Sequence, residues 1–196
     1  FISMEKNNLR DIALKSIDET IFYPPQGQTR LRSMIETRPD WCVSRQRVWG
    51  VPLPLFVNKK TGQPLRDENI INRIADIYEK EGSNTWFTED PQRFLGDEYS
   101  IKDYEQVKDV VEVWFDSGST HAFCLEQRED LKWPASMYLE GSDQHRGWFH
   151  SSLLESSGTR GKAPYESVLT HGFVVDGRGR KMSKSLGNVI SPDDIL

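Results

Sequence analysis

Apolar residues recur at helical spacing in two stretches of the chain, one near its start and one before its midpoint. A helix within residues 4–19 is expected from apolar residues at helical spacing, namely Leu9, Ile12, Ala13 and Ile17. The second stretch has apolar residues three and four positions apart, namely Ile70, Ile71, Ile74, Ile77 and Tyr78. Gly82 follows it and is expected to end the helix. Both patterns predict helices with one buried face.

Short β-type runs alternate with these helices. The first helix is expected to end before Pro24 and Pro25, and residues 51–57 are expected to be extended. Three further apolar runs predict strands, at residues 110–115, 137–139 and 167–175. Strands that alternate with helices in this way indicate an α/β fold with a parallel sheet.

Charge is distributed unevenly around a net value of −5. Residues 66–112 contain six basic and thirteen acidic side chains, which is typical of a solvated insertion. Residues 28–49 have five basic against two acidic side chains, and residues 160–184 have six against two. Either basic stretch could face an anionic ligand or form ordinary charged surface, and the sequence leaves both readings open.

Composition excludes several classes of protein. Among 196 residues, 36% are hydrophobic and 11% aromatic, which does not fit a disordered chain. Cys42 and Cys124 stand alone and the four histidines lack ligand spacing, so we expect no disulfide scaffold, no zinc site and no other metal site. There is neither a run of about 18 apolar residues nor a signal-peptide pattern. We therefore expect a cytoplasmic protein with no membrane partner.

The last residues resemble the beginning of a helix. Ser191 suits the N-cap position, Pro192 the first helical position, and two aspartates follow. We read this as a sign that the chain is a piece of a longer polypeptide.

A glycine turn after the predicted strand at 137–139 is the first candidate site. Glu140 and Asp143 flank Gly141, and a helix is expected to begin at about Asp143 or Gln144. At the carboxyl edge of an open α/β sheet such a turn can bind a ligand, because glycine allows close approach to the backbone. In the alternative reading, Asp143 only caps the helix and Glu140 is solvated.

A basic loop after the last predicted strand is the second candidate site. Gly177 and Gly179 make it flexible. Its four cations are Arg178, Arg180, Lys181 and Lys184. Lysine ammonium groups on long stems suit a phosphate chain, although the loop lacks the Walker pattern. A solvated hairpin tip is the alternative. Likewise, the arginines and tryptophans of residues 38–52 could bind nucleic acid or form a packed corner.

Four segments carry a resemblance to a known family. Residues 181–185, Lys-Met-Ser-Lys-Ser, resemble the signature loop of class I aminoacyl-tRNA synthetases. Residues 40–52 and 114–118 resemble segments of the enzymes for branched aliphatic amino acids, and residues 140–149 are similar to the isoleucine-specific members. No His-x-Gly-His motif occurs. The family carries that motif in the first half of its nucleotide-binding fold, so half of the active site is expected to lie outside this chain.

The resemblance implies the second half of a Rossmann-like catalytic domain at residues 1–57 and 109–196, with a connective insertion at 58–108. The activity it implies is activation of isoleucine by ATP, taken up with Mg²⁺, and transfer to isoleucine tRNA. The remainder of the parent polypeptide would be needed, so the isolated chain is expected to be inactive. A non-catalytic RNA-binding relative and another adenylate-forming nucleotidyltransferase remain the alternatives.

The resemblance also implies a role for each site residue. Glu140 and Gly141 would hold the adenylate, and Asp143 and Gln144 the ribose and the amino acid. Trp148 would wall the isoleucine pocket and His171 would contact the nucleotide. The ATP-binding residues would be Lys181, Met182, Ser183, Lys184 and Ser185, of which Lys181 and Lys184 would be catalytic.

Overall fold

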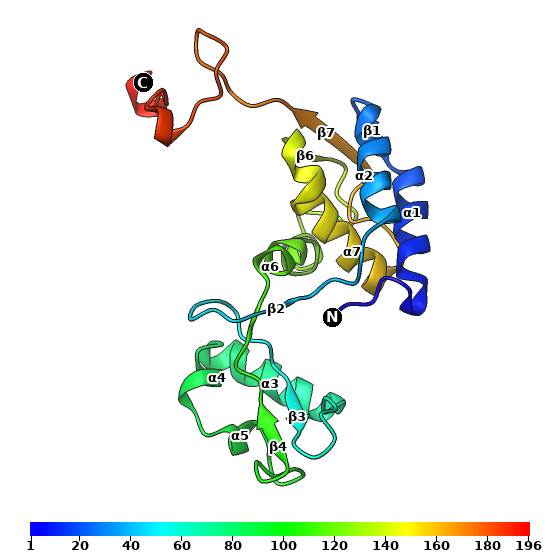
Figure 1. Ribbon diagram of the computed structural model, residues 1–196, viewed down its shortest axis with the longest axis vertical. Helices are drawn as coiled ribbons and strands as arrows, with labels where there is room; N and C mark the ends of the chain where they lie inside the picture. The colour runs from blue at the N-terminus through cyan, green and yellow to red at the C-terminus, as the bar shows by residue number, and fades with distance from the viewer. The chain divides into compact units, whose positions relative to one another are not determined.

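A parallel sheet of three strands confirms the α/β prediction (Figure 1). Its order is β1 (Ile21–Tyr23), β7 (Ser167–His171) and β6 (Tyr138–Gly141), with β7 in the middle. β7 pairs in parallel with both neighbours, and Gly141 lies opposite His171. The carboxyl ends of β6 and β7 therefore meet at one edge of the sheet.

The computed structural model describes residues 1–196, which divide into two units. One unit consists of residues 4–39 and 117–196 and contains this sheet. The other consists of residues 1–3 and 40–116 and contains the whole acidic stretch of residues 66–112. No helix in either unit combines the length and the apolar content that crossing a bilayer requires.

Three helices accompany the parallel sheet, and one of them was not predicted. α1 (Leu9–Glu19) confirms the first predicted helix, and α7 (Trp148–Arg160) the helix after β6. α2 (Gln26–Glu36) begins directly after Pro24 and Pro25, which the sequence indicates only as the end of the first helix. A Cβ on Gly27 would lie 2.8 Å from His145 Nε2, so glycine allows α2 to approach this histidine closely.

The helix after β6 begins later than predicted. A short 3₁₀ helix, η3 (Ser142–Arg146), comes first, and α7 begins only at Trp148. Gly147 separates them because its φ and ψ, both −117°, are not helical. Phe149 and Leu153, four positions apart in α7, are fully buried.

Two predicted strands are too long. The run at 110–115 forms only β5 (Val110–Val111), paired with β2 (Ser44–Arg45), before the chain turns into α6 (Val113–Gly118). The buried Glu112 carboxylate accepts a hydrogen bond from the Trp114 N–H at 3.3 Å, which supports the helix start. β7 ends at His171 rather than at residue 175, where Val175 instead bridges to Lys181.

The acidic stretch surrounds an apolar core of its own. β3 (Phe56–Asn58) overlaps the end of the predicted extended region at 51–57. It pairs antiparallel with β4 (Tyr104–Gln106), which lies outside that region. α3 (Glu68–Glu81) confirms the isoleucine-rich helix and ends at Gly82, whose φ of 86° favours glycine. Two short helices follow, α4 (Thr85–Thr88) and α5 (Pro91–Leu95).

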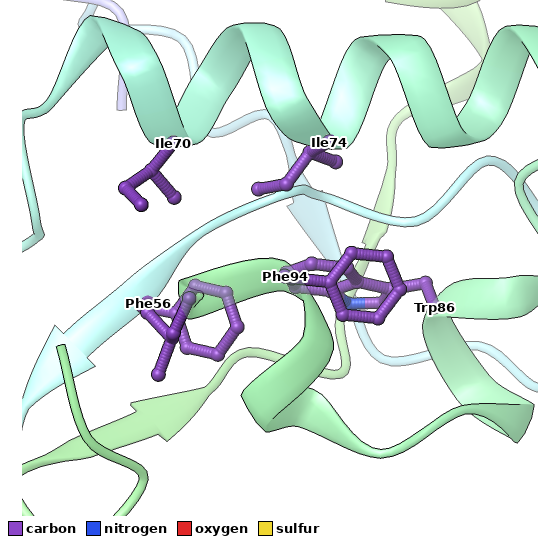
Figure 2. Packing of buried hydrophobic residues seen from close by; sticks show 6 residues of the cluster. Phe56, Ile70, Ile74, Trp86 and Phe94 are labelled. Carbon is purple, nitrogen blue, oxygen red and sulfur yellow. The ribbon is translucent and has the colours of Figure 1, made fainter. Parts of the chain in front are cut away.

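Figure 2 shows this core, in which Ile70 and Ile74 of α3 face a group of aromatic rings. The rings of Phe56 and Phe94 lie 5.1 Å and 4.9 Å from that of Trp86. The Trp86 indole donates a hydrogen bond to the Val107 carbonyl at 2.8 Å. Burial of large apolar side chains therefore stabilises this segment in spite of its acidic surface.

The shorter elements are single turns. A π-helix turn spans His121–Leu125. A 3₁₀ turn near the chain end, η5 (Pro192–Asp194), has Ser191 as its cap, and Asp194 accepts a hydrogen bond from the Ser191 N–H in return. The predicted N-cap is confirmed.

A buried histidine makes the stability of the sheet-containing unit depend on pH. His150 of α7 is 5% exposed, and burial, with Arg38 and Arg146 nearby, lowers its pKa to about 3. The unfolded chain binds a proton at this histidine below about pH 6.5, whereas the folded chain does so only near pH 3. The free energy of unfolding is therefore highest above pH 6.5 and falls by up to about 1.4 kcal/mol per pH unit as the pH drops towards 3. Between pH 7 and pH 5, urea unfolding should show about 1–2 kcal/mol more loss in the wild type than in His150→Gln. Equal losses would contradict this prediction.

Candidate functional site

The glycine turn at the end of β6 gathers several of the predicted site residues. A Cβ on Gly141 would lie 2.6 Å from Asp143 Oδ1 and 4.0 Å from His171 Cε1, so these three residues are close neighbours. Glu140 is exposed beside them, and its carboxylate accepts a hydrogen bond from the Gly141 N–H at 3.2 Å. The turn therefore presents two carboxylates and an imidazole around a residue that has no side chain.

Trp148 is held in place from three directions. Its ring stacks on Tyr138 at 3.9 Å with an interplanar angle of 4°. Its indole N–H donates to the Ser117 carbonyl at 3.0 Å, and its backbone N–H donates to Gln144 Oε1 at 2.9 Å. The Gln144 amide therefore caps the start of α7, a role that the sequence did not indicate. Trp148 is half-buried, which suits a fixed wall beside the turn.

The basic loop forms a hairpin that is joined by backbone and side-chain hydrogen bonds. The Met182 N–H donates to the Val174 carbonyl at 3.0 Å, and the Asp176 N–H donates to the Arg180 carbonyl at 2.8 Å. The Asp176 carboxylate accepts from the N–H groups of Arg178 and Arg180 at 2.9 Å and 3.0 Å. The hydrogen bond from the Asn188 amide, together with these backbone contacts, lowers the Asp176 pKa to about 2. Asp176 is therefore ionised at neutral pH.

The four cations of this hairpin differ in their surroundings. Arg180 forms an ion pair with Asp176 at 2.8 Å, so part of its charge is neutralised. The Lys181 ammonium lies 3.5 Å from the centre of the Phe173 ring. Lys184 and Arg178 are exposed, and neither forms an ion pair. Lys184 follows Ser183, whose hydroxyl caps the 3₁₀ turn η4 (Lys184–Leu186).

The structure does not connect the glycine turn with the hairpin. The hairpin's hydrogen bonds, ion pair and ring contact all stay within residues 173–188. Glu140, Gly141, Asp143, Gln144, Trp148 and His171 thus form one group, and Lys181, Met182, Ser183, Lys184 and Ser185 a second one.

The arginine- and tryptophan-containing segment is partly packed and partly exposed. Trp41 is buried, and its indole donates to the Glu112 carboxylate at 3.2 Å. The Arg45 guanidinium donates to the carbonyl oxygens of Cys42 and Ser44 at 2.6 Å and 2.9 Å. Trp49, in contrast, is 89% exposed. The packed-corner reading therefore holds for the beginning of the segment, and only its end offers a free aromatic ring.

Comparison with known proteins gives one family for the whole chain. The model of the class I tRNA synthetases (I, L, M and V) matches residues 1–196. An isoleucine--tRNA ligase of Pelagibacter ubique is 72% identical over 196 residues, and one of Brucella abortus is 59% identical over 202 aligned residues. Both alignments include all of this chain, but the chain spans only 22% and 21% of these relatives.

Two solved structures share the fold at low sequence identity. A Mycobacterium tuberculosis methionyl-tRNA synthetase bound by methionyl-adenylate matches 96% of this chain and 28% of its own, with a TM-score of 0.53 and 20% identity. An Agrobacterium radiobacter LeuRS in a ternary complex with tRNA and LeuAMS matches 80% of this chain and 22% of its own, with a TM-score of 0.50 and 20% identity. Both support a Rossmann-like arrangement.

Proposed function

The chain belongs to the class I tRNA synthetase family, and on that premise we propose that it is part of an enzyme that activates isoleucine with ATP and transfers it to tRNA. The isoleucine carboxylate would attack the α-phosphate of ATP, forming isoleucyl-adenylate and releasing pyrophosphate. A tRNA hydroxyl would then take the acyl group and release AMP. No covalent bond to the protein is needed, because positioning and charge stabilisation suffice for this chemistry.

The observation that carries the proposal is the group of residues around Gly141 at the sheet edge. Ligands of open α/β sheets bind beyond the carboxyl ends of the strands. Glu140 would pair with the α-ammonium group of isoleucine, and the backbone of Gly141 would allow the adenylate to approach. Asp143 would accept hydrogen bonds from the ribose, and His171, opposite Gly141 in the sheet, would contact the nucleotide.

Trp148 and Gln144 would act on the amino-acid side. The stacked and hydrogen-bonded Trp148 ring is a rigid apolar surface against which an isoleucine side chain could pack. Gln144 Oε1 accepts a hydrogen bond from the backbone N–H of Trp148. Gln144 would therefore act by positioning Trp148 as well as through its own amide N–H groups.

The lysines of the hairpin would stabilise the triphosphate. We assign Lys181 and Lys184 to negative charge that grows on the phosphates during attack, with Met182, Ser183 and Ser185 completing the segment that faces ATP. Mg²⁺ would arrive with ATP, since this ion binds substrate phosphates and keeps several waters. Residues 1–57 and 109–196 would belong to the catalytic domain and residues 58–108 to its insertion.

The proposal also includes binding partners and a cellular location. The partners would be isoleucine tRNA and the remainder of the parent polypeptide, which would supply the other half of the active site. A cytoplasmic location fits two cysteines that form no disulfide.

Isoleucine-dependent exchange of pyrophosphate into ATP tests the proposed function directly. The full-length protein should exchange pyrophosphate with isoleucine and much less with valine or leucine, while the purified 196-residue chain should not. A full-length protein that binds tRNA without any exchange would instead be the RNA-binding alternative. Exchange with an unrelated acid substrate would favour another nucleotidyltransferase.

Glu140→Ala in the full-length protein should weaken isoleucine binding more than ATP binding. A hydrogen bond between charged groups contributes roughly 1.5–3 kcal/mol, which corresponds to about 10- to 150-fold in affinity. Equilibrium titrations with isoleucine and with ATP measure the two effects separately. The assignment is reversed if isoleucine affinity stays unchanged while ATP affinity falls.

A further inference from the structure

Two side chains twelve positions apart join the beginning and the end of the lysine-bearing segment. The Asn188 amide donates to Asp176 Oδ2 at 3.0 Å. The sequence analysis assigned no role to either residue. The chain between them contains every residue assigned to the triphosphate, so this bond closes a loop around those residues.

Each partner also binds backbone inside the loop. Asp176 accepts from the N–H groups of Arg178 and Arg180, and its side chain is only 14% exposed. Asn188 Oδ1 accepts from the Ser183 N–H at 3.0 Å, and its amide also donates to the Lys181 carbonyl at 3.3 Å. The backbone is therefore held on both sides of Met182.

The contact to Ser183 bears directly on Lys184. Ser183 precedes Lys184, and its hydroxyl accepts a hydrogen bond from the Leu186 N–H at 3.3 Å, which caps the turn that begins at Lys184. A fixed Ser183 backbone thus determines where the Lys184 stem starts. A charged group that is positioned in advance stabilises a transition state better than one that must be ordered during the reaction.

We propose that Asp176 and Asn188 are positioning residues that form a side-chain latch, and that this latch presents the Lys184 ammonium to the reacting phosphates. The effect on the reaction rests on the proposed function, whereas the effect on the loop does not. Neither side chain needs to touch the substrate.

An exchange of the two side chains tests the latch. Asn188→Asp places a second carboxylate opposite Asp176 and removes both bonds that the amide donates. Asp176→Asn places two amide donors opposite each other. The double variant Asp176→Asn/Asn188→Asp restores the bond between the two side chains with reversed polarity, but neither the bond to the Lys181 carbonyl nor the ion pair with Arg180. Asp193→Asn is the matched control, because it removes an exposed carboxylate nearby that accepts no hydrogen bond from the loop.

Hydrogen exchange in the full-length protein reports the latch without any need for activity. Asn188→Asp should speed amide exchange of residues 178–184 by about tenfold, the expected loss for one or two hydrogen bonds. Strands β6 and β7 should be unaffected, whereas general destabilisation would speed their exchange as well. The double variant should exchange more slowly than Asn188→Asp although not as slowly as the wild type, and Asp193→Asn should match the wild type.

Pyrophosphate exchange then reports the positioning. Asn188→Asp should lower kcat by about tenfold with an unchanged KM for isoleucine, and the double variant should regain part of that loss. Unchanged amide exchange in Asn188→Asp, or no recovery in the double variant, overturns the latch. If the loop loosens while kcat stays at the wild-type value, the positioning role is wrong. A wild-type protein without pyrophosphate exchange refutes the proposed function instead, and amide exchange still decides the latch.

Discussion

Replacing Lys184 by alanine in the full-length protein is expected to slow the formation of isoleucyl-adenylate by about 10²–10³-fold. This is the usual loss for one preorganised group that stabilises developing charge. Lys184 is exposed and free of ion pairs, so its ammonium is available to a triphosphate. Single-turnover formation of the adenylate at saturating ATP and isoleucine measures the effect.

Two measurements separate this role from a general effect. Isoleucine binding without ATP should hardly change, because an interaction made only in the transition state costs rate and not ground-state affinity. Arg178→Ala removes another exposed cation of the same hairpin and should have a much smaller effect. Lys184→Arg should rescue partly, since a planar guanidinium replaces a compact ammonium. A wild-type rate in Lys184→Ala would make the hairpin an ordinary surface feature.

The second large effect concerns stability. Trp86→Ala should lower the free energy of unfolding of the unit formed by residues 1–3 and 40–116 by about 3–5 kcal/mol, the range for large aromatic residues in cores. Trp86 is fully buried among Phe56, Phe94 and the α3 isoleucines, and its loss also leaves the Val107 carbonyl without its donor. Urea unfolding followed by circular dichroism measures the change.

The neighbouring residue supplies the control. Phe87 belongs to the same short helix but is 42% exposed. Phe87→Ala should cost less than about 1 kcal/mol, because substitutions of exposed side chains seldom do more. Similar losses for the two variants would mean that the aromatic cluster does not stabilise this unit.

The sequence predicted a helix correctly where the spacing of apolar residues and the residues at the helix ends indicate the same element. α3 has isoleucines at helical spacing, the Asp67 side chain as its N-cap, and Gly82 at its end. α2 was missed because Pro24 and Pro25 were read as a break, although proline is well tolerated at a helix start. The run at 110–115 could not be divided from its sequence alone, since an apolar run suits a strand and a helix equally.

The glycine turn could be predicted from the sequence better than the contacts within the hairpin. The convergence of Glu140, Gly141 and His171 follows from the rule that parallel strands end at one edge, so the sequence could predict it. The bond between Asp176 and Asn188 joins side chains twelve positions apart and follows no period. The cap that Gln144 provides for α7 depends equally on a turn whose conformation the sequence did not specify.

The contact between Lys181 and the Phe173 ring affects how readily this lysine can move to a phosphate group. An ammonium over an exposed aromatic face is held by only about 0.5–1 kcal/mol, and Phe173 is 48% exposed. Had Lys181 rested on a carboxylate, departure would leave an anion behind that repels an incoming triphosphate. A neutral ring leaves no such charge. The contact with Phe173 therefore holds the Lys181 ammonium at little cost to its transfer to a triphosphate.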